Sequence, residues 1–309
     1  MQQPNYYQDN ARTMKHTCTV LSFGCVVMMI IMQALGVLLI LGMQFLSRRV
    51  AASQLFLNLV SALSFYGVGI PVFYLIVKTI PAVHAQQKLR MRVDEIMTWA
   101  VISLGGMYLF NYFSVWLNEV ISIFKGSPVI NPVASATENI WVTILFSVIL
   151  APFFEELVFR GMILNRLKPY GEKMSIFFSA LLFAMFHGNL YQMFYAFAIG
   201  CAFAFVALRT GHIGYTVGLH MFVNLCGGVI FPLLATSKWE LVIGLMGIFV
   251  IVLMISAIVL FAVNFYRFRR LAPGLPVFGK TKVRLALCNP GMAVYATATL
   301  VLILVNILA

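Results

Sequence analysis

Charged side chains are scarce in this chain, where Asp, Glu, Lys and Arg make up only 10% of 309 residues. A soluble domain carries about 25% of such residues. With 62% hydrophobic residues and a mean hydropathy of +0.96, the chain has too few polar side chains to cover a water-soluble globule. These observations exclude a soluble domain and predict an all-α, polytopic bundle of eight to nine transmembrane helices.

Several short motifs are also absent. The five cysteines include no CxxC pair, and four of them lie in apolar stretches, so we expect small buried side chains rather than a disulfide framework. No HExxH is present, which excludes a zinc site carried by one helix in that pattern. The first apolar stretch lacks a small-residue cleavage site, so we expect it to be retained rather than removed as a signal peptide.

The apolar stretches themselves predict the domain organisation. A polar tail, residues 1–17, precedes a single transmembrane domain, residues 18–309. Pro71 is expected to kink the second span, and a strongly basic loop, residues 264–290, precedes the last. The predicted spans are residues 19–45, 55–77, 96–124, 138–164, 175–186, 190–208, 213–230, 241–263 and 292–308.

The positive charge of the chain indicates its orientation. A net charge of +12 would suggest nucleic acid as the partner of a soluble protein, but here the basic residues concentrate in alternate loops, and we expect no nucleic acid. With the N-terminus in the cytoplasm, all but four of the 21 Lys and Arg residues fall on the cytoplasmic side. We therefore predict a multi-pass protein of a cell membrane, bacterial in type, with a cytoplasmic N-terminus. The four exceptions are Arg48, Arg49, Lys125 and Lys238.

Two of the nine acidic residues, Glu155 and Glu156, are adjacent within an apolar run. An ionised group near the centre of a bilayer costs roughly 2.5–3.5 kcal/mol on insertion scales, so such residues normally face a bundle interior or a water-filled cavity. Glu156 and Arg160 are four residues apart and can pair on one helix face. Glu155 is turned about 100° away from that face and is left available for chemistry.

Two histidines, His187 and His220, lie at or within predicted spans. Phe183 precedes His187 by four residues, and Asn224 follows His220 by four, so each pair shares a helix face. A single histidine or asparagine in a membrane helix commonly joins helices by hydrogen bonds. Polar residues on three spans at similar depth instead favour a shared catalytic or ion site, in a cavity open to the cytoplasm. Tyr195 is expected to be an interfacial aromatic residue.

Three motifs carry a resemblance to a known family. EELVFRG (Glu155–Gly161) resembles the EExxxR motif of the CPBP family of intramembrane endopeptidases, also called Abi, which includes CAAX prenyl proteases. FAMFH (Phe183–His187) resembles its FxxxH motif, and HMFVN (His220–Asn224) its HxxxN motif. The resemblance covers roughly residues 152–224 and places a catalytic core at about 138–230. It implies hydrolysis of a peptide bond in a membrane-associated peptide or lipidated protein, from a prenylated CAAX tail to a peptide precursor.

Residue chemistry assigns a role to each motif residue. Glu155 is the expected general base that activates water, and His187 helps to position that water. His220 and Asn224 are expected to donate to the oxyanion of the tetrahedral intermediate. The predicted catalytic residues are Glu155, Glu156, His187, His220 and Asn224, with Arg160 and Phe183 as structural support.

Metal dependence and the class of function leave alternatives open. Glu155, His187 and His220 could supply a three-ligand zinc site, but they come from three separate helices, and a metal-free mechanism without a cofactor is favoured. Membrane lipids are expected partners besides the substrate. A proton-coupled transporter could use the same residues as a relay, although no inverted repeat is visible. A catalytically silent immunity or scaffold protein of the same fold is the third hypothesis.

Overall fold

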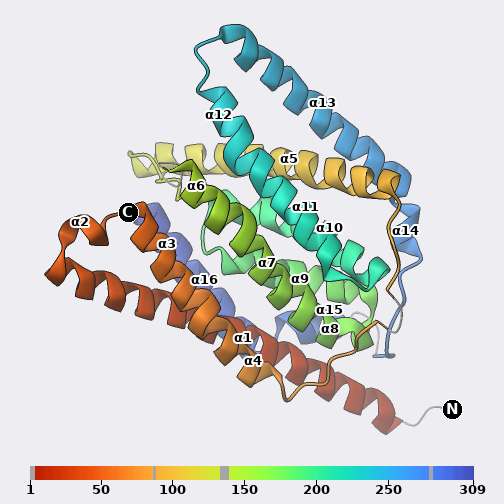
Figure 1. The fold of residues 1–309 in the computed structure, drawn as a ribbon. Helices are drawn as coiled ribbons and strands as arrows, with labels where there is room; N and C mark the ends of the chain where they lie inside the picture. The colour runs from red at the N-terminus through yellow and green to blue at the C-terminus, as the bar shows by residue number, and fades with distance from the viewer. Residues whose placement is uncertain (1–3, 86–87, 133–138, 278–280) are drawn as a thin grey trace.

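The computed structural model describes residues 4–85, 88–132, 139–277 and 281–309, and within these ranges it is a bundle of helices without strands (Figure 1). Eight of its helical stretches are long and apolar enough to cross a membrane. The predicted all-α polytopic bundle is therefore confirmed. The α-helices are α1 (Pro4–Leu46), α2 (Arg48–Ala51), α3 (Gln54–Ala62), α4 (Ile70–Val77), α5 (Val93–Lys125), α6 (Ile140–Thr143), α7 (Ala151–Glu156), α8 (Leu164–Leu167), α9 (Glu172–Phe186), α10 (Leu190–Thr210), α11 (Ile213–Leu225), α12 (Phe231–Ala235), α13 (Glu240–Asn264), α14 (Tyr266–Arg269), α15 (Thr281–Leu287) and α16 (Pro290–Leu308). Four π-helices interrupt them: η1 (Leu63–Gly69), η3 (Ile144–Leu150), η4 (Leu157–Ile163) and η6 (Cys226–Ile230).

The fifth predicted span, residues 175–186, corresponds to α9, and it is the one predicted span that is not among the eight candidate membrane helices. Its 15 residues extend about 22 Å, less than the ~30 Å of a hydrocarbon core. Phe178, Ala180 and Leu182 are fully buried, so α9 lies inside the bundle. It ends immediately before His187, so that histidine lies at the C-terminal end of the helix.

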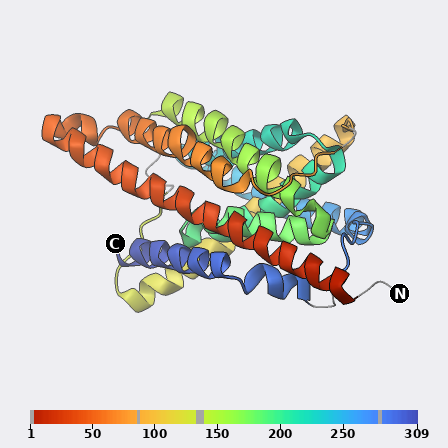
Figure 2. The same ribbon diagram turned by 90° about the horizontal axis from the view of Figure 1, so that it is seen from below.

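The N-terminus differs from the predicted tail, because α1 already begins at Pro4. Met14 is fully buried, and the hydroxyl of Thr17 lies 2.9 Å from that of Tyr170. Figure 2 shows α1 running along the length of the molecule beside α15 and α16, which it contacts. The prediction of a tail for residues 4–17 is therefore wrong: a polar segment becomes helical here because its apolar face packs on the bundle.

Prolines account for three of the π-helices. Pro71, Pro152 and Pro232 are each the second residue of the α-helix that follows η1, η3 or η6. A proline has no N–H, and its ring displaces the carbonyl four residues earlier, so a wider turn relieves the clash. The residue before each proline donates five residues back, as Ala151 does to the Phe146 carbonyl. Pro71, expected to kink the second span, thus follows a π-helix, and η3 and η4 flank the adjacent glutamates.

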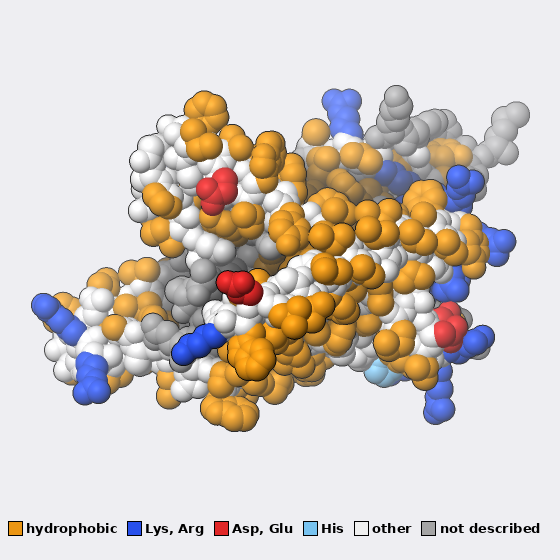
Figure 3. Space-filling view, turned by 90° about the horizontal axis from the view of Figure 1, so that it is seen from above, with side chains coloured by type: hydrophobic (Ala, Val, Ile, Leu, Met, Phe, Trp, Pro, Cys, Tyr) orange, Lys and Arg blue, Asp and Glu red, His pale blue; other side chains and the backbone are white. Residues whose placement is uncertain are grey.

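Several chain segments meet at one end of the bundle. The Leu89 N–H donates to the Thr210 carbonyl at 2.8 Å, and the Glu172 N–H donates to that of Ala272 at 2.9 Å. We call this end, formed by residues 88–95, 165–173, 209–212 and 265–277, the basic end. Figure 3 shows most of the visible Lys and Arg side chains gathered there, with hydrophobic side chains over the middle and a smaller basic group opposite. Its basic residues are Lys88, Arg90, Arg92, Arg166, Lys168, Lys173, Arg209, Arg267, Arg269 and Arg270.

The predicted basic loop, residues 264–290, is partly helical, since it contains α14 and α15. The Arg267 guanidinium pairs with Glu95 at 3.1 Å. The Lys282 ammonium donates to the carbonyls of Tyr170 and Pro273, at 2.9 and 2.7 Å, and burial lowers the pKa of Lys282 from its ordinary value. These contacts fold the segment back over the basic end.

Candidate active site

Glu156 and Arg160 form a fully buried ion pair. Arg160 Nη1 lies 2.9 Å from Glu156 Oε1, and both side chains are 0% exposed. Arg160 Nη2 also donates to the Gly200 carbonyl of α10 at 3.1 Å. A buried charge is tolerated only when it is paired and hydrogen-bonded. The predicted pairing of these residues is thus confirmed, and the pair fixes the motif helix against α10.

Aromatic rings enclose the Arg160 guanidinium. Its central carbon lies 4.6 Å from the Phe183 ring centroid and 5.6 Å from that of Phe203. The Phe183 ring also meets His187 and His220 edge-on, with centroids 5.0 and 5.9 Å apart. Phe183 therefore contacts the second and third motifs and the arginine of the first, which agrees with the supporting role predicted for it.

His220 connects the two glutamates. Its Nδ1 lies 3.1 Å from Glu156 Oε1, and its Nε2 lies 3.8 Å from Glu155 Oε2. The ionised Glu156 carboxylate can only accept, so the Nδ1 of His220 carries a hydrogen and donates it. This bond orients the ring and turns Nε2 toward Glu155, much as a buried carboxylate orients a catalytic histidine.

Glu155 has a different environment from its neighbour. Its side chain is 17% exposed, whereas that of Glu156 is 0% exposed. The only described basic side chain within ion-pair distance of Glu155 is His220. Tyr66, on η1, and Tyr195, on α10, lie within electrostatic range of its carboxylate. Glu155 is thus a partly accessible carboxylate without a close counter-ion.

These two tyrosines were not identified as site residues from the sequence. Tyr195 was expected at the membrane interface; the structure places it, half-buried, within electrostatic range of Glu155. Tyr66 stacks on Phe154 at a centroid distance of 4.2 Å, next to the motif. A tyrosine in an apolar helix carries no spacing that distinguishes an interior position from an interfacial one, so no sequence signal could have found them.

His187 stands at the C-terminal end of α9. Its Nδ1 is 2.9 Å from the Phe183 carbonyl, which can only accept, so Nδ1 carries the hydrogen and Nε2 is left as an acceptor. The ring lies within electrostatic range of Glu155 and His220. The second motif is therefore brought to the first and third.

Asn224 lies one turn beyond His220 on α11. Its amide donates to the Ser147 carbonyl in η3 at 2.8 Å. A side-chain amide has two N–H groups, so one remains for another partner. Asn224 thus joins α11 to the span that carries the glutamates, in addition to any part it takes in catalysis.

Glutamate and histidine side chains are also the donors that a metal ion would use. Within the described ranges, no three His, Cys, Asp or Glu side chains are grouped as ligands of a metal would be. The predicted zinc alternative used Glu155, His187 and His220 as three ligands around an open fourth position. Zinc dependence therefore stays an alternative prediction beside the metal-free mechanism.

The fold and this site together define a class of protein: a polytopic membrane protein with a glutamate–histidine centre buried among its helices. Residues 134–226 match the family described as type II CAAX prenyl endopeptidase, Rce1-like. The match covers about three-tenths of the chain and includes all three motifs. It confirms the resemblance of this segment to the CPBP intramembrane endopeptidases. Neither the curated proteins nor the solved structures give a match.

Proposed function

We propose that this protein is an intramembrane endopeptidase in which Glu155 activates the water that attacks a peptide bond. The family match implies a membrane protease acting on a peptide or prenylated protein. The observation that carries the proposal is the different state of the two adjacent glutamates. Glu156 is neutralised by Arg160 and bonded to His220, whereas Glu155 has no close counter-ion and faces the Nε2 of His220.

A water molecule fits between Glu155 and His220. The 3.8 Å between Glu155 Oε2 and His220 Nε2 is longer than a direct hydrogen bond, and polar atoms at such a separation are commonly bridged by water. With Nδ1 of His220 committed to Glu156, Nε2 and Glu155 are both acceptors. The water then donates one hydrogen to each and directs its lone pairs at the substrate carbonyl.

The hydrolysis follows from this arrangement. Glu155 takes one proton from the water as the oxygen attacks the carbonyl carbon, and a tetrahedral oxyanion forms. Collapse of that intermediate breaks the C–N bond, and Glu155 returns its proton to the departing amine. The Nε2 of His187 accepts a hydrogen bond from the substrate amide.

The oxyanion needs donors. The second N–H of Asn224 serves this role, because the first is bonded to Ser147. A single donor of this kind contributes about 10²–10³ in rate. His220 was expected to be a second donor; its bond to Glu156 favours positioning the water instead.

The basic end defines the side from which substrates approach. We infer that it faces the cytoplasm, because its arginines and lysines satisfy the positive-inside rule there. A CAAX-type substrate is a cytoplasmic C-terminus with a lipid anchor, so it would enter from this side and place its tail at the depth of Glu155.

The test is hydrolysis by the purified protein in liposomes of matched farnesylated and unmodified CAAX-type peptides, followed by mass spectrometry in ¹⁸O water. We expect one ¹⁸O atom in the new carboxyl group, loss of cleavage with Glu155→Gln, and wild-type cleavage with Glu119→Gln, which removes an exposed carboxylate of α5. Faster cleavage of the farnesylated peptide assigns the CAAX class; equal rates assign peptide precursors. Undiminished cleavage with Glu155→Gln contradicts the mechanism. Absence of cleavage by the wild-type protein favours the transporter or the silent scaffold.

A further inference from the structure

A cavity lies along α10. Its volume is about 600 Å³, and its walls come from α5, α9, α10, α13 and α14. None of the predicted site residues lines it. The Gly200 carbonyl accepts from Arg160, and the next residue of α10, Cys201, lines the cavity. Helix α10 therefore borders both this cavity, which we call the α10 groove, and the candidate active site.

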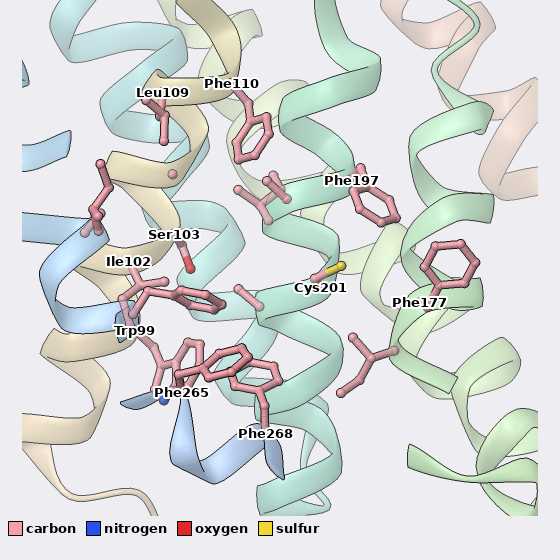
Figure 4. Close-up of a pocket in the computed structure, with 18 of the residues that line it drawn as sticks. Trp99, Ile102, Ser103, Leu109, Phe110, Phe177, Phe197, Cys201, Phe265 and Phe268 are labelled. Carbon is pink, nitrogen blue, oxygen red and sulfur yellow. The ribbon is translucent and has the colours of Figure 1, made fainter. Parts of the chain in front are cut away.

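The α10 groove is apolar along its length. Figure 4 shows Trp99, Phe265 and Phe268 together at one end, Leu109 and Phe110 at the other, and Phe197 along the wall. Phe110 and Phe265 are 40% and 45% exposed, so both ends reach the surface that faces the bilayer. Apolar walls of this kind do not hold water, and an apolar chain is the occupant that they fit.

The length of the groove matches one leaflet. From Trp99 to Phe110 it follows α5 for about three turns, or about 16 Å. The hydrocarbon core is about 30 Å thick, so one leaflet contributes about 15 Å. The volume also lies in the range of about 300–1,000 Å³ that single ligands occupy.

Two cations stand at the mouth of the groove. Lys173, at the start of α9, and Arg269, at the end of α14, both line it and both lie in the basic end. Neither forms an ion pair with a described carboxylate. The nearby Glu172 accepts from the Ala272 N–H, and Glu95 is paired with Arg267. The two positive charges are therefore free to bind an anion.

We propose that the α10 groove is a binding site for an anionic glycerophospholipid of the leaflet at the basic end. One acyl chain fills the apolar groove, and the phosphate lies against Lys173 and Arg269. An uncharged lipid would leave Lys173 and Arg269 without an anionic partner. A soluble anion would leave the apolar groove unfilled. The site is separate from the proposed catalytic function, because it does not open on Glu155 and its occupancy is measured without cleavage.

The occupant is tested with lipids of matched chains. Dioleoyl phosphatidylglycerol, dioleoyl phosphatidylcholine and glycerol 3-phosphate are added to the delipidated protein in detergent, and melting and native mass spectra are recorded. We expect one bound phosphatidylglycerol per chain and a melting temperature raised by about 5 °C at saturating lipid. Phosphatidylcholine and glycerol 3-phosphate should each give less than half that rise. Equal effects of the two phospholipids would overturn the proposal.

Variants locate the site. Lys173→Gln with Arg269→Gln should abolish the preference for phosphatidylglycerol, whereas Arg270→Gln with Arg284→Gln removes two exposed charges outside the groove and should retain it. Ala198→Phe, which adds a ring to the groove wall, should reduce binding of both phospholipids. An unchanged preference in the Lys173 and Arg269 variant would refute the site. Displacement of phosphatidylglycerol by the farnesylated peptide would assign the groove to the substrate instead.

Discussion

Replacing Glu156 by Gln tests the division of labour between the two glutamates most directly. The change keeps the shape and an acceptor oxygen for His220 but removes the negative charge 2.9 Å from Arg160 Nη1. Arg160 is then a buried cation whose remaining bond is to the Gly200 carbonyl. Removing one partner of a buried pair costs about 3–5 kcal/mol, because the other charge stays desolvated without compensation.

The same substitution at Glu155 should have a different effect. This side chain is 17% exposed and no closer than 3.8 Å to its only described basic neighbour, so Glu155→Gln should change the free energy of unfolding by less than ~1 kcal/mol. Loss of the base should nevertheless slow turnover by about 10²–10⁴. We therefore predict that Glu156→Gln mainly lowers stability, whereas Glu155→Gln mainly lowers activity.

A double-mutant cycle between Glu156 and Arg160 serves as the control for the stability measurement. Glu156→Gln, Arg160→Gln and the double variant are melted in one detergent, and the free energies of unfolding are compared. The double variant buries no unpaired charge, so its loss should be smaller than the sum of the single losses by about 1–3 kcal/mol. Additive losses within ~0.5 kcal/mol, or a stable but inactive Glu156→Gln together with an active Glu155→Gln, would refute the assigned roles.

Three further predictions concern the oxyanion, the orientation and the packing. Asn224→Ala should lower kcat about 10²-fold with little change in KM, and single-turnover kinetics will show whether the loss lies in the chemical step; a wild-type rate would contradict the role. Cys288 is the only exposed cysteine among the described residues and follows α15, so an impermeant maleimide should label it in inside-out but not right-side-out vesicles, with Cys288→Ser as the blank. Labelling only in right-side-out vesicles would reverse the topology. Gly291→Ala should lower the free energy of unfolding by about 1–3 kcal/mol, because its Cβ would overlap the Thr19 carbonyl. Gly244→Ala is the control, since its Cβ would meet open space and should leave stability unchanged. Equal melting temperatures of the two variants would refute the close packing of α1 on α16.

The helices were predictable because each rests on a local signal. The span predicted over residues 190–208 is α10, and that predicted over 241–263 is α13, each within two residues at either end. Hydropathy suffices there, since a membrane helix satisfies its backbone within itself and needs only apolar side chains outside. The prediction of a tail was wrong for the opposite reason. Residues 4–17 are polar by composition, and their helix is explained by contacts far along the chain, such as that of Thr17 with Tyr170.

The sequence by itself determined the class of protein, the course of the helices and the pairing of Glu156 with Arg160, because composition and a spacing of four residues act within one segment. Only the tertiary structure decided which atoms meet. His220 bridges the two glutamates across 64 residues of sequence, Asn224 bonds to Ser147, and Tyr66 stacks on Phe154 beside the motif. Such contacts depend on how the helices rotate and approach one another. Packing of the whole bundle sets that arrangement, and it produces no periodic pattern in the sequence. The α10 groove is of the same kind, since five helices form it.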